Sequence, residues 1–277
     1  MKCDAPIGVF DSGLGGLTVA RRIMERLSHE SITYVGDEIH VPYGERSADE
    51  IRGFALGITE FLIGRKAKLV VMACNMSSAT ALPLARDRFP GVPIIGVIEA
   101  GVRAAARITG GGPIGVLATT GTVKSGAYTR EFERLLPAAV VIEQACPKFV
   151  PLVEAGDWNS QDAEEAIREY TDPLLSAGCR TLVLGCTHYP FLSETISRVA
   201  GQGVTLIDPA DETAEEAARI LADAELLNAP HAEPAYCYCT TDLPESFSDL
   251  GSRFLGRDIF DVQRIAWGVE LGVPCRI

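Results

Sequence analysis

The stretch Leu69-Val70-Val71-Met72-Ala73-Cys74-Asn75 carries the pattern that predicts the fold. An unbroken apolar run is followed directly by a cysteine and a polar turn, which is typical of a strand buried on both faces of a sheet. Leu182-Val183-Leu184-Gly185-Cys186-Thr187 repeats this arrangement further along the chain. We therefore expect two buried strands, each of which places a cysteine at the carboxyl end of a parallel sheet, where α/β proteins bind ligands.

Short apolar runs of this kind recur along the chain and alternate with segments whose apolar residues have helical spacing. The predicted strands are Ile7–Phe10, Ile32–Val35, Leu69–Ala73, Pro93–Val97, Ile114–Ala118, Val140–Glu143, Thr181–Gly185 and Val204–Ile207. The alternation predicts an α/β protein whose parallel sheets are covered by helices on both faces. After about Asn228 the pattern weakens, and the prolines at 230 and 234 indicate a loop before the C-terminal tail.

The two halves of the chain resemble each other weakly. Ile7-Gly8-Val9-Phe10 is echoed by Ile114-Gly115-Val116-Leu117, and a cysteine follows 67 residues after Ile7 and 72 residues after Ile114. Chance similarity between such units is common, so the echo is consistent with duplication or with coincidence. A duplication would predict two similar lobes, and the glycine-rich segment 109–113 is a candidate hinge between a helix and a strand.

Composition excludes several classes of function. The formal net charge of −12 argues against sequence-independent binding of nucleic acid, which needs clustered lysine and arginine. No apolar run approaches the roughly 18 residues needed to span a membrane, and the N-terminal apolar stretch is too short for a signal peptide. We therefore expect a cytoplasmic protein without a membrane partner, in which the eight cysteines are free thiols.

Cys74 and Cys186 each lie at a predicted strand-to-helix turn, where helix N-terminal amides favour the thiolate and lower the pKa of the thiol. One such cysteine alone is more often a small buried apolar residue. Two in matching contexts, with His188 beside the second, favour chemistry. Thiols on opposite faces of an amino acid can remove its α-proton from one side and return a proton from the other.

The turn that begins at Asp11 is also rich in glycine. Its glycines allow the backbone to approach a ligand, and Ser12 can cap the following helix. The turn does not match the dinucleotide-binding fingerprint, because Thr18 stands where the third glycine is required, and no Gly-Lys-Ser/Thr follows as in a phosphate-binding loop. By itself this turn does not identify a ligand.

Together these segments closely resemble the glutamate racemase family. The matching motifs are Asp11-Ser12-Gly13, Pro42-Tyr43-Gly44, Ala73-Cys74-Asn75, Ala118-Thr119-Thr120-Gly121-Thr122, Leu152-Val153-Glu154, Gly185-Cys186-Thr187-His188-Tyr189-Pro190 and Ile207-Asp208-Pro209. The resemblance implies two α/β lobes related by pseudo-twofold symmetry, formed by residues 1–97 plus 208–277 and by residues 98–207, with the active site between them. It also implies an enzyme without a cofactor, a homodimer, and a supply of D-glutamate for peptidoglycan and cell-wall synthesis.

The resemblance also implies roles for individual residues. Cys74 would take the α-proton from D-glutamate and Cys186 from L-glutamate, with Asp11 assisting the first thiol, His188 assisting the second, and Glu154 nearby on the second side. The residues implied to line the substrate pocket are Ser12, Pro42, Tyr43, Gly44, Asn75, Thr119, Thr122 and Thr187. Their hydroxyl, amide and backbone donors suit a substrate with two carboxylates.

Met76 departs from the pattern of that family, in which the first cysteine motif usually reads Cys-Asn-Thr. Loss of a hydrogen bond to a charged substrate group costs about 1.5–3 kcal/mol, unless Ser77, Ser78 or a water compensates. Met76 therefore leaves open a racemase of a related amino acid such as aspartate, or a catalytically silent binding protein. A metal site built from Cys74, Cys186 and His188 is disfavoured, because the spacing from Cys186 to His188 is not that of common zinc motifs.

Overall fold

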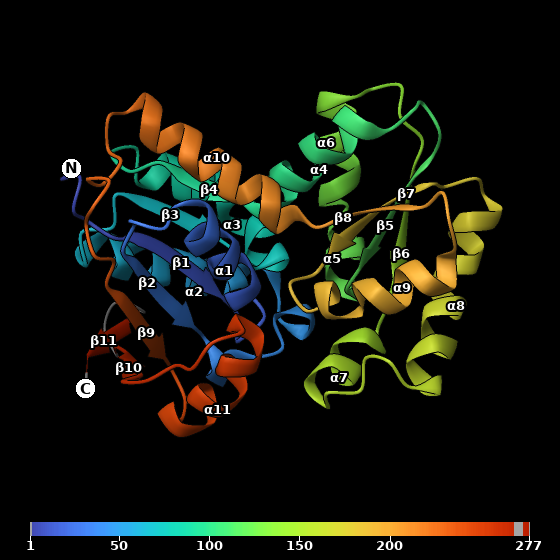
Figure 1. Ribbon diagram of the computed structural model, residues 1–277. Coiled ribbons are helices and arrows are strands. Elements are labelled where there is room, and N and C mark those ends of the chain that lie inside the picture. Colours follow the sequence, from blue (N-terminus) through green and yellow to red (C-terminus); the bar gives the residue numbers. More distant parts are fainter. Residues whose placement is uncertain (1, 269–273, 277) are drawn as a thin grey trace. The chain divides into compact units, whose positions relative to one another are not determined.

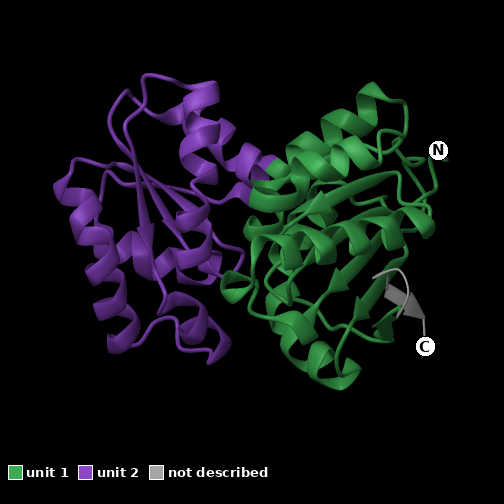
Figure 2. Ribbon diagram, turned by 180° about the vertical axis from the view of Figure 1, so that it is seen from behind, with its two compact units in different colours: residues 1–97, 213–277 green, residues 98–212 purple. Residues whose placement is uncertain are grey.

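The computed structural model describes residues 2–268 and 274–276. The chain forms two compact units, residues 1–97 with 213–277 and residues 98–212 (Figure 2). Residues 208–212 group with the second unit, whereas the division expected from the sequence assigned them to the first. That sequence-based division of domains stays a prediction.

The first unit contains a seven-stranded sheet with the strand order β11-β10-β9-β2-β1-β3-β4 (Figure 1). Its elements are β1 (Ile7–Asp11), α1 (Leu17–Arg26), β2 (Ile32–Gly36), the 3₁₀ helices η1 (Glu38–His40) and η2 (Tyr43–Glu45), α2 (Ala48–Gly64), β3 (Leu69–Met72), α3 (Asn75–Arg88), β4 (Ile94–Gly96), β9 (Tyr236–Thr240), α11 (Pro244–Leu255), β10 (Gln263–Trp267) and β11 (Pro274–Arg276). All described strand pairs are parallel except β10 with β11, which is antiparallel.

Strands β1, β2 and β3 are buried along their whole length, as the apolar runs predicted. Alternate side chains point to opposite faces, so that Phe10 and Met72 join a core with α2 and α3, represented by Ile58 and Leu82. On the other face, the ring of Tyr34 packs against Phe247 of α11, with ring centroids 6.0 Å apart. Helices therefore cover both faces of the central strands, which explains their near-continuous hydrophobicity.

The second unit contains a four-stranded parallel sheet with the order β6-β5-β7-β8. Its elements are α4 (Val97–Ile108), β5 (Ile114–Ala118), α5 (Thr120–Ser125), α6 (Ala127–Leu135), β6 (Val141–Ala145), α7 (Phe149–Glu154), α8 (Gln161–Ser176), β7 (Thr181–Gly185), the 3₁₀ helix η3 (Tyr189–Leu192), α9 (Ser193–Ala200) and β8 (Thr205–Ile207), and α10 (Pro209–Asp223) runs from this unit into the first. In the described part of the chain, no helix is long and apolar enough to cross a membrane.

The two units share an ordering of strands. The run β2-β1-β3-β4 of the first sheet has the same connectivity as β6-β5-β7-β8 of the second. The α/β class and the two parallel sheets expected from the sequence are confirmed. The C-terminal part was less apparent in the sequence, because β9 pairs with β2, about 200 residues earlier in the chain, and on its other side with β10.

Candidate functional site

In the first unit, Asp11 and Cys74 lie at the carboxyl ends of two adjacent parallel strands. Asp11 ends β1, and the preceding Phe10 pairs with Met72 at the end of β3. The Ala73 amide N–H donates to the Phe10 carbonyl at 2.9 Å, and Cys74 follows at the N-cap of α3. The register of the two strands therefore brings the carboxylate and the thiol to the same edge of the sheet.

The Asp11 carboxylate is buried and held by the glycine-rich turn that follows it. Its Oδ2 accepts a hydrogen bond from the Gly16 N–H at 2.6 Å. A Cβ at position 16 would lie 2.5 Å from the Asp11 Cβ and 2.9 Å from the Ala73 Cβ, so that only glycine fits here. The turn thus fixes the carboxylate at the strand end, and Ser12, half-buried, is the next residue.

Burial, the largest cause, and the negative charge of Asp11 together raise the pKa of the Cys74 thiol to about 12, whereas the position at a helix start had predicted a lowered pKa. The amide and hydroxyl of Ser77 and the hydroxyl of Ser12 act in the opposite direction and lower the pKa. The charges of Asp11 and Cys74 also help to raise the pKa of Tyr34, after the larger effect of burial. Tyr34 was missed in the sequence, where its only signal is a hydroxyl within an otherwise buried strand; this hydroxyl donates to the Gly13 carbonyl at 2.7 Å.

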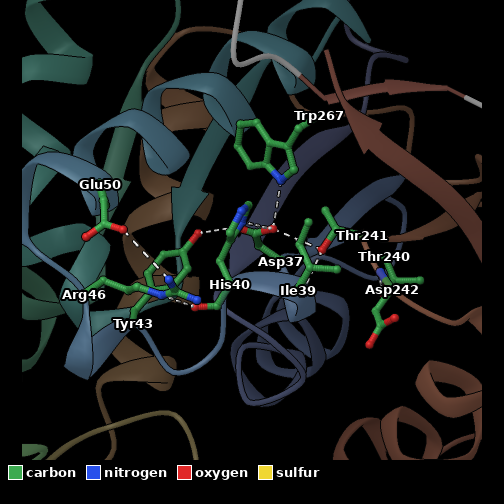
Figure 3. A network of polar contacts seen from close by, with 10 residues as sticks. All are labelled: Asp37, Ile39, His40, Tyr43, Arg46, Glu50, Thr240, Thr241, Asp242 and Trp267. Carbon is green, nitrogen blue, oxygen red and sulfur yellow. Dashed lines mark hydrogen bonds and ion pairs between the residues drawn. The ribbon is translucent and has the colours of Figure 1, made fainter. Parts of the chain in front are cut away.

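Asp37 organises a network that holds the loop around Tyr43 (Figure 3). The Asp37 side chain is fully buried and accepts hydrogen bonds from the Tyr43 hydroxyl at 2.7 Å, the Thr241 hydroxyl at 3.0 Å and the Trp267 indole N–H at 3.2 Å. The His40 Nδ1 lies 2.8 Å from Asp37 Oδ2. The C-terminal part of the first unit therefore helps to position the loop that contains Pro42, Tyr43 and Gly44, which the family resemblance implies as substrate-lining residues.

Tyr43 belongs to a small buried cluster that reaches the thiol. This cluster contains Tyr43, Ile51, Cys74 and Met76, with Phe54 packed against it. Burial raises the pKa of Tyr43 well above its usual range, and the charge of Asp37 has the next largest effect. Met76, the residue that departs from the family pattern, thus contacts the immediate surroundings of the thiol through its apolar side chain.

The other residues expected in the first half of the site differ in exposure. Pro42 and Gly44, on either side of Tyr43, are exposed, and a Cβ at position 44 would meet no atom within 4 Å. Asn75 opens α3 and is buried. The exposed loop residues and the helix N-terminus provide backbone donors and acceptors at the strand ends.

In the second unit, Cys186 directly follows β7 and has an imidazole beside it. The Cys186 Sγ lies 3.8 Å from His188 Nδ1, and His188 Nε2 lies 3.5 Å from Glu154 Oε1. The Glu154 side chain is 56 % exposed, whereas that of His188 is 13 % exposed. The three groups form a chain from the buried thiol to the surface along which a proton can move.

Three threonines expected in the second half of the site surround the same strand ends. Thr119 follows β5 and caps α5 by accepting the Thr122 N–H at 3.3 Å, and the two hydroxyl oxygens are 3.0 Å apart. Ala118 of β5 pairs with Gly185 of β7, so that Thr119 and Cys186 leave neighbouring strands at the same edge. Thr187 is buried.

Tyr128 is a second buried tyrosine that no pattern in the sequence had indicated. Burial raises its pKa, followed by the charges of Glu143, Cys186 and Asp208. Glu143 in turn accepts hydrogen bonds from the amide and the hydroxyl of Thr129 through Oε1. Within the described residues, no group of three or more histidine, cysteine, aspartate or glutamate side chains has the arrangement of a metal site.

Comparisons with known proteins point to a single family. Residues 7–217 match the family described as Asp/Glu/Hydantoin racemase. A glutamate racemase from Corynebacterium glutamicum is 44% identical over 263 residues, which cover 94% of this chain and 96% of that protein. The crystal structure of a glutamate racemase isoform from Bacillus anthracis has a TM-score of 0.90 at 38% identity and covers 97% of this chain and 98% of the other. A glutamate racemase from Francisella tularensis, solved in complex with D-glutamate, has a TM-score of 0.89 at 34% identity, with 95% and 98% covered.

Proposed function

Because the chain belongs to the Asp/Glu/hydantoin racemase family and, within it, to the glutamate racemases, we propose that it interconverts L- and D-glutamate by moving the α-proton between Cys74 and Cys186. The chain is an amino-acid racemase, which is an isomerase. The observation that carries the mechanism is the matched placement of the thiols, since Cys74 follows β3 and Cys186 follows β7 in sheets of the same strand order.

The reaction needs one thiolate and one thiol. The thiolate takes the α-proton, the electron pair of the broken C–H bond stays on the α-carbon, and the thiol delivers its proton to the opposite face of that carbon. Cys74 takes the proton from D-glutamate, and Cys186 takes it from L-glutamate. Both reacting groups are side chains that exchange their roles at each turnover, so the mechanism requires no cofactor.

The free enzyme holds Cys74 as the acid. With a pKa of about 12, only about one molecule in ten thousand has a Cys74 thiolate at pH 8. Cys74 is therefore ready to protonate the carbanion formed from L-glutamate. For D-glutamate it must first lose its proton, and Asp11 is the adjacent buried carboxylate that assists. The ammonium group of the amino acid offsets the charge of Asp11 and so favours the thiolate.

Cys186 has a different partner on its side of the reaction. The imidazole of His188, 3.8 Å from the sulfur, exchanges a proton with the thiol and stabilises the thiolate in its charged form. Glu154, 3.5 Å from the other ring nitrogen, orients the imidazole. His188 is thus the assistant of Cys186, and Glu154 acts through His188.

The substrate is held by polar groups at the carboxyl ends of the strands. We assign this role to Ser12, Pro42, Tyr43, Gly44, Asn75, Thr119, Thr122 and Thr187. The hydroxyls, the Asn75 amide and the N–H groups at the start of α3 are donors that suit the two carboxylates of glutamate. The Asp37 network supports this assignment, because it fixes the Tyr43 loop before any substrate arrives.

Met76 supports a second candidate, a racemase for another amino acid. Its thioether is buried against the cluster around Cys74 and cannot donate a hydrogen bond as a threonine does. A related substrate such as aspartate, with a shorter side chain, is the nearest alternative, and a silent binding protein is the next. The presence of Cys74, Cys186, Asp11 and His188 together argues against the silent protein.

In the cell, D-glutamate is needed for peptidoglycan, so the enzyme's place is in cell-wall synthesis. A substrate that is a small soluble amino acid, and thiols that must stay reduced, both fit the cytoplasm. We further propose that the enzyme works as a homodimer, as the resemblance to its family implies.

The direct test is incubation of the purified protein with L-glutamate and, separately, D-glutamate, with optical rotation followed over time. The proposal expects both solutions to approach the racemate. Cys74→Ala and Cys186→Ala each lose about 10²–10⁴-fold of this rate, because each removes one acid/base group. Cys179→Ala, which changes a buried free cysteine elsewhere in the second unit, is the matched control and keeps the rate.

Absence of inversion for both glutamate enantiomers contradicts the substrate assignment. Aspartate and other amino acids are then tested in the same way. Inversion of one of them supports the related racemase, and inversion of none supports the silent binding protein.

A further inference from the structure

Cys74 and Ser77 occupy two positions of α3 that face each other. Cys74 is the N-cap residue and Ser77 is the third residue of the helix. Side chains three residues apart at a helix start are neighbours, and in a capping box the side chain at the third position reaches back to the N-cap residue. The fold of the helix start therefore brings the Ser77 hydroxyl towards the Cys74 sulfur.

The Ser77 side chain is fully buried, and its hydroxyl has no hydrogen-bond partner among the described residues. A buried hydroxyl without a partner costs about 1–3 kcal/mol, and most buried polar groups in proteins are satisfied. By contrast, the neighbouring Ser78 hydroxyl is fully used: it donates to the Met72 carbonyl at 2.9 Å and accepts from the Val97 N–H at 3.2 Å. The Ser77 hydroxyl thus remains an unused donor, although alanine at this position would avoid the free-energy cost of burying it.

Two other helices of this chain show how such pairs behave. At the start of α2, the Ser47 hydroxyl and the Glu50 carboxylate are hydrogen-bonded at 2.7 Å. At the start of α5, the hydroxyls of Thr119 and Thr122 are 3.0 Å apart. In both helices the side chains at the N-cap and third positions bind each other, and Cys74 and Ser77 occupy the same two positions at the start of α3.

We propose that the Ser77 hydroxyl donates a hydrogen bond to the Cys74 thiolate and thereby stabilises the charged form of this reacting group. This role deepens the proposed racemase function and rests on it for its use in catalysis. A thiol is a weak acceptor, whereas a thiolate is a strong one. The hydroxyl is therefore poorly satisfied in the resting thiol and well satisfied once the proton has left.

The surroundings of the thiol explain why such a donor is useful. Burial and the charge of Asp11 both oppose the thiolate, whereas the Ser77 amide and hydroxyl and the Ser12 hydroxyl favour it. Met76, beside Ser77 in the sequence, brings no donor to this helix start. Ser77 thus restores a hydroxyl to the same turn, directed to the sulfur rather than to the substrate.

The test measures the reactivity of Cys74 directly, without glutamate. Iodoacetamide reacts with thiolates, so the alkylation rate of the Cys74 peptide, followed by mass spectrometry between pH 7 and pH 10, reports the thiolate fraction. Ser77→Ala should lower this rate about tenfold at each pH, which corresponds to a rise of about one unit in the pKa of Cys74. Ser77→Thr keeps a hydroxyl and should restore the rate to within about threefold.

Ser78→Ala is the matched control, because it removes a hydroxyl one residue further along the same helix. It should leave the alkylation rate of Cys74 within about twofold. Ser77→Ala should also keep or raise the melting temperature, since it removes an unsatisfied hydroxyl. An unchanged rate in Ser77→Ala, or an equal fall in Ser78→Ala, overturns the proposal.

The racemase proposal is judged separately. A tenfold fall in alkylation without any glutamate inversion supports the role of Ser77 at the sulfur and contradicts the glutamate function. Normal inversion with an unchanged alkylation rate in Ser77→Ala supports the racemase and overturns the role of Ser77.

Discussion

The two units place a cysteine in the same way but surround it differently. In both, the thiol follows a buried parallel strand of a sheet with the same order. Cys74 is accompanied by a buried carboxylate and hydroxyls, whereas Cys186 is accompanied by an imidazole connected to the exposed Glu154. The strand order thus determines where each thiol lies, and the few residues around it determine which polar groups lie beside the sulfur.

Among the substitutions that distinguish the surroundings of Cys186 from those of Cys74, His188→Ala is expected to have the largest effect on the racemisation rate. Removal of the imidazole takes away the proton partner that we propose for Cys186, so racemisation should fall about 10²–10⁴-fold, measured as optical rotation with either enantiomer. Glu154→Gln is the matched control on the same chain of groups. Because the Glu154 side chain is 56 % exposed, its charge is screened and the rate should fall only about threefold. Equal losses in the two variants would contradict the separate roles.

Much of this comparison could be predicted from the sequence, because it rests on local patterns. The apolar runs that end at Cys74 and Cys186 predicted both strands, and β5 has the expected bounds, Ile114–Ala118. Strand burial of this kind is encoded in consecutive residues, which explains why the α/β class was predicted correctly.

The polar surroundings could not be predicted, because they depend on contacts between distant segments. Asp37 lies in a stretch that the sequence presents only as a polar loop, and its partners Thr241 and Trp267 follow more than 200 residues later. The strand β9, which brings Thr241 to this place, lies between β2 and β10, two strands that are far from each other in the sequence. The role of Ser77 required knowledge of the helix start and of the burial of its hydroxyl.

A smaller effect, confined to the first unit, is expected from Asp11→Asn. The negative charge of Asp11 raises the pKa of Cys74, so its removal lowers that pKa below about 12. The alkylation rate of Cys74 between pH 7 and pH 10 should rise about tenfold, equivalent to about one pKa unit. Racemisation should fall, because the carboxylate that we propose to assist Cys74 is lost. Unchanged reactivity of Cys74 would refute the electrostatic link between the two residues.

The smallest expected effect concerns the Asp37 network that supports the Tyr43 loop in the first unit. Trp267→Phe removes the indole N–H that donates to Asp37 at 3.2 Å but keeps an aromatic ring beside Phe54. The free energy of unfolding of the first unit should fall by about 1.5 kcal/mol, measured by urea titration with circular dichroism. A free energy that does not change would show that the indole N–H makes no net contribution to the network.

The central claim is that two different thiols act on the two faces of glutamate. L-Glutamate is incubated with the enzyme in D₂O, and the enantiomers are separated at early times and analysed for α-deuterium by mass spectrometry. Two bases predict that the D-glutamate formed carries α-deuterium, whereas the remaining L-glutamate keeps its α-proton. Deuterium that enters L-glutamate as fast as inversion occurs would contradict the claim, because a single base would then return the solvent-derived hydrogen to the face from which it came.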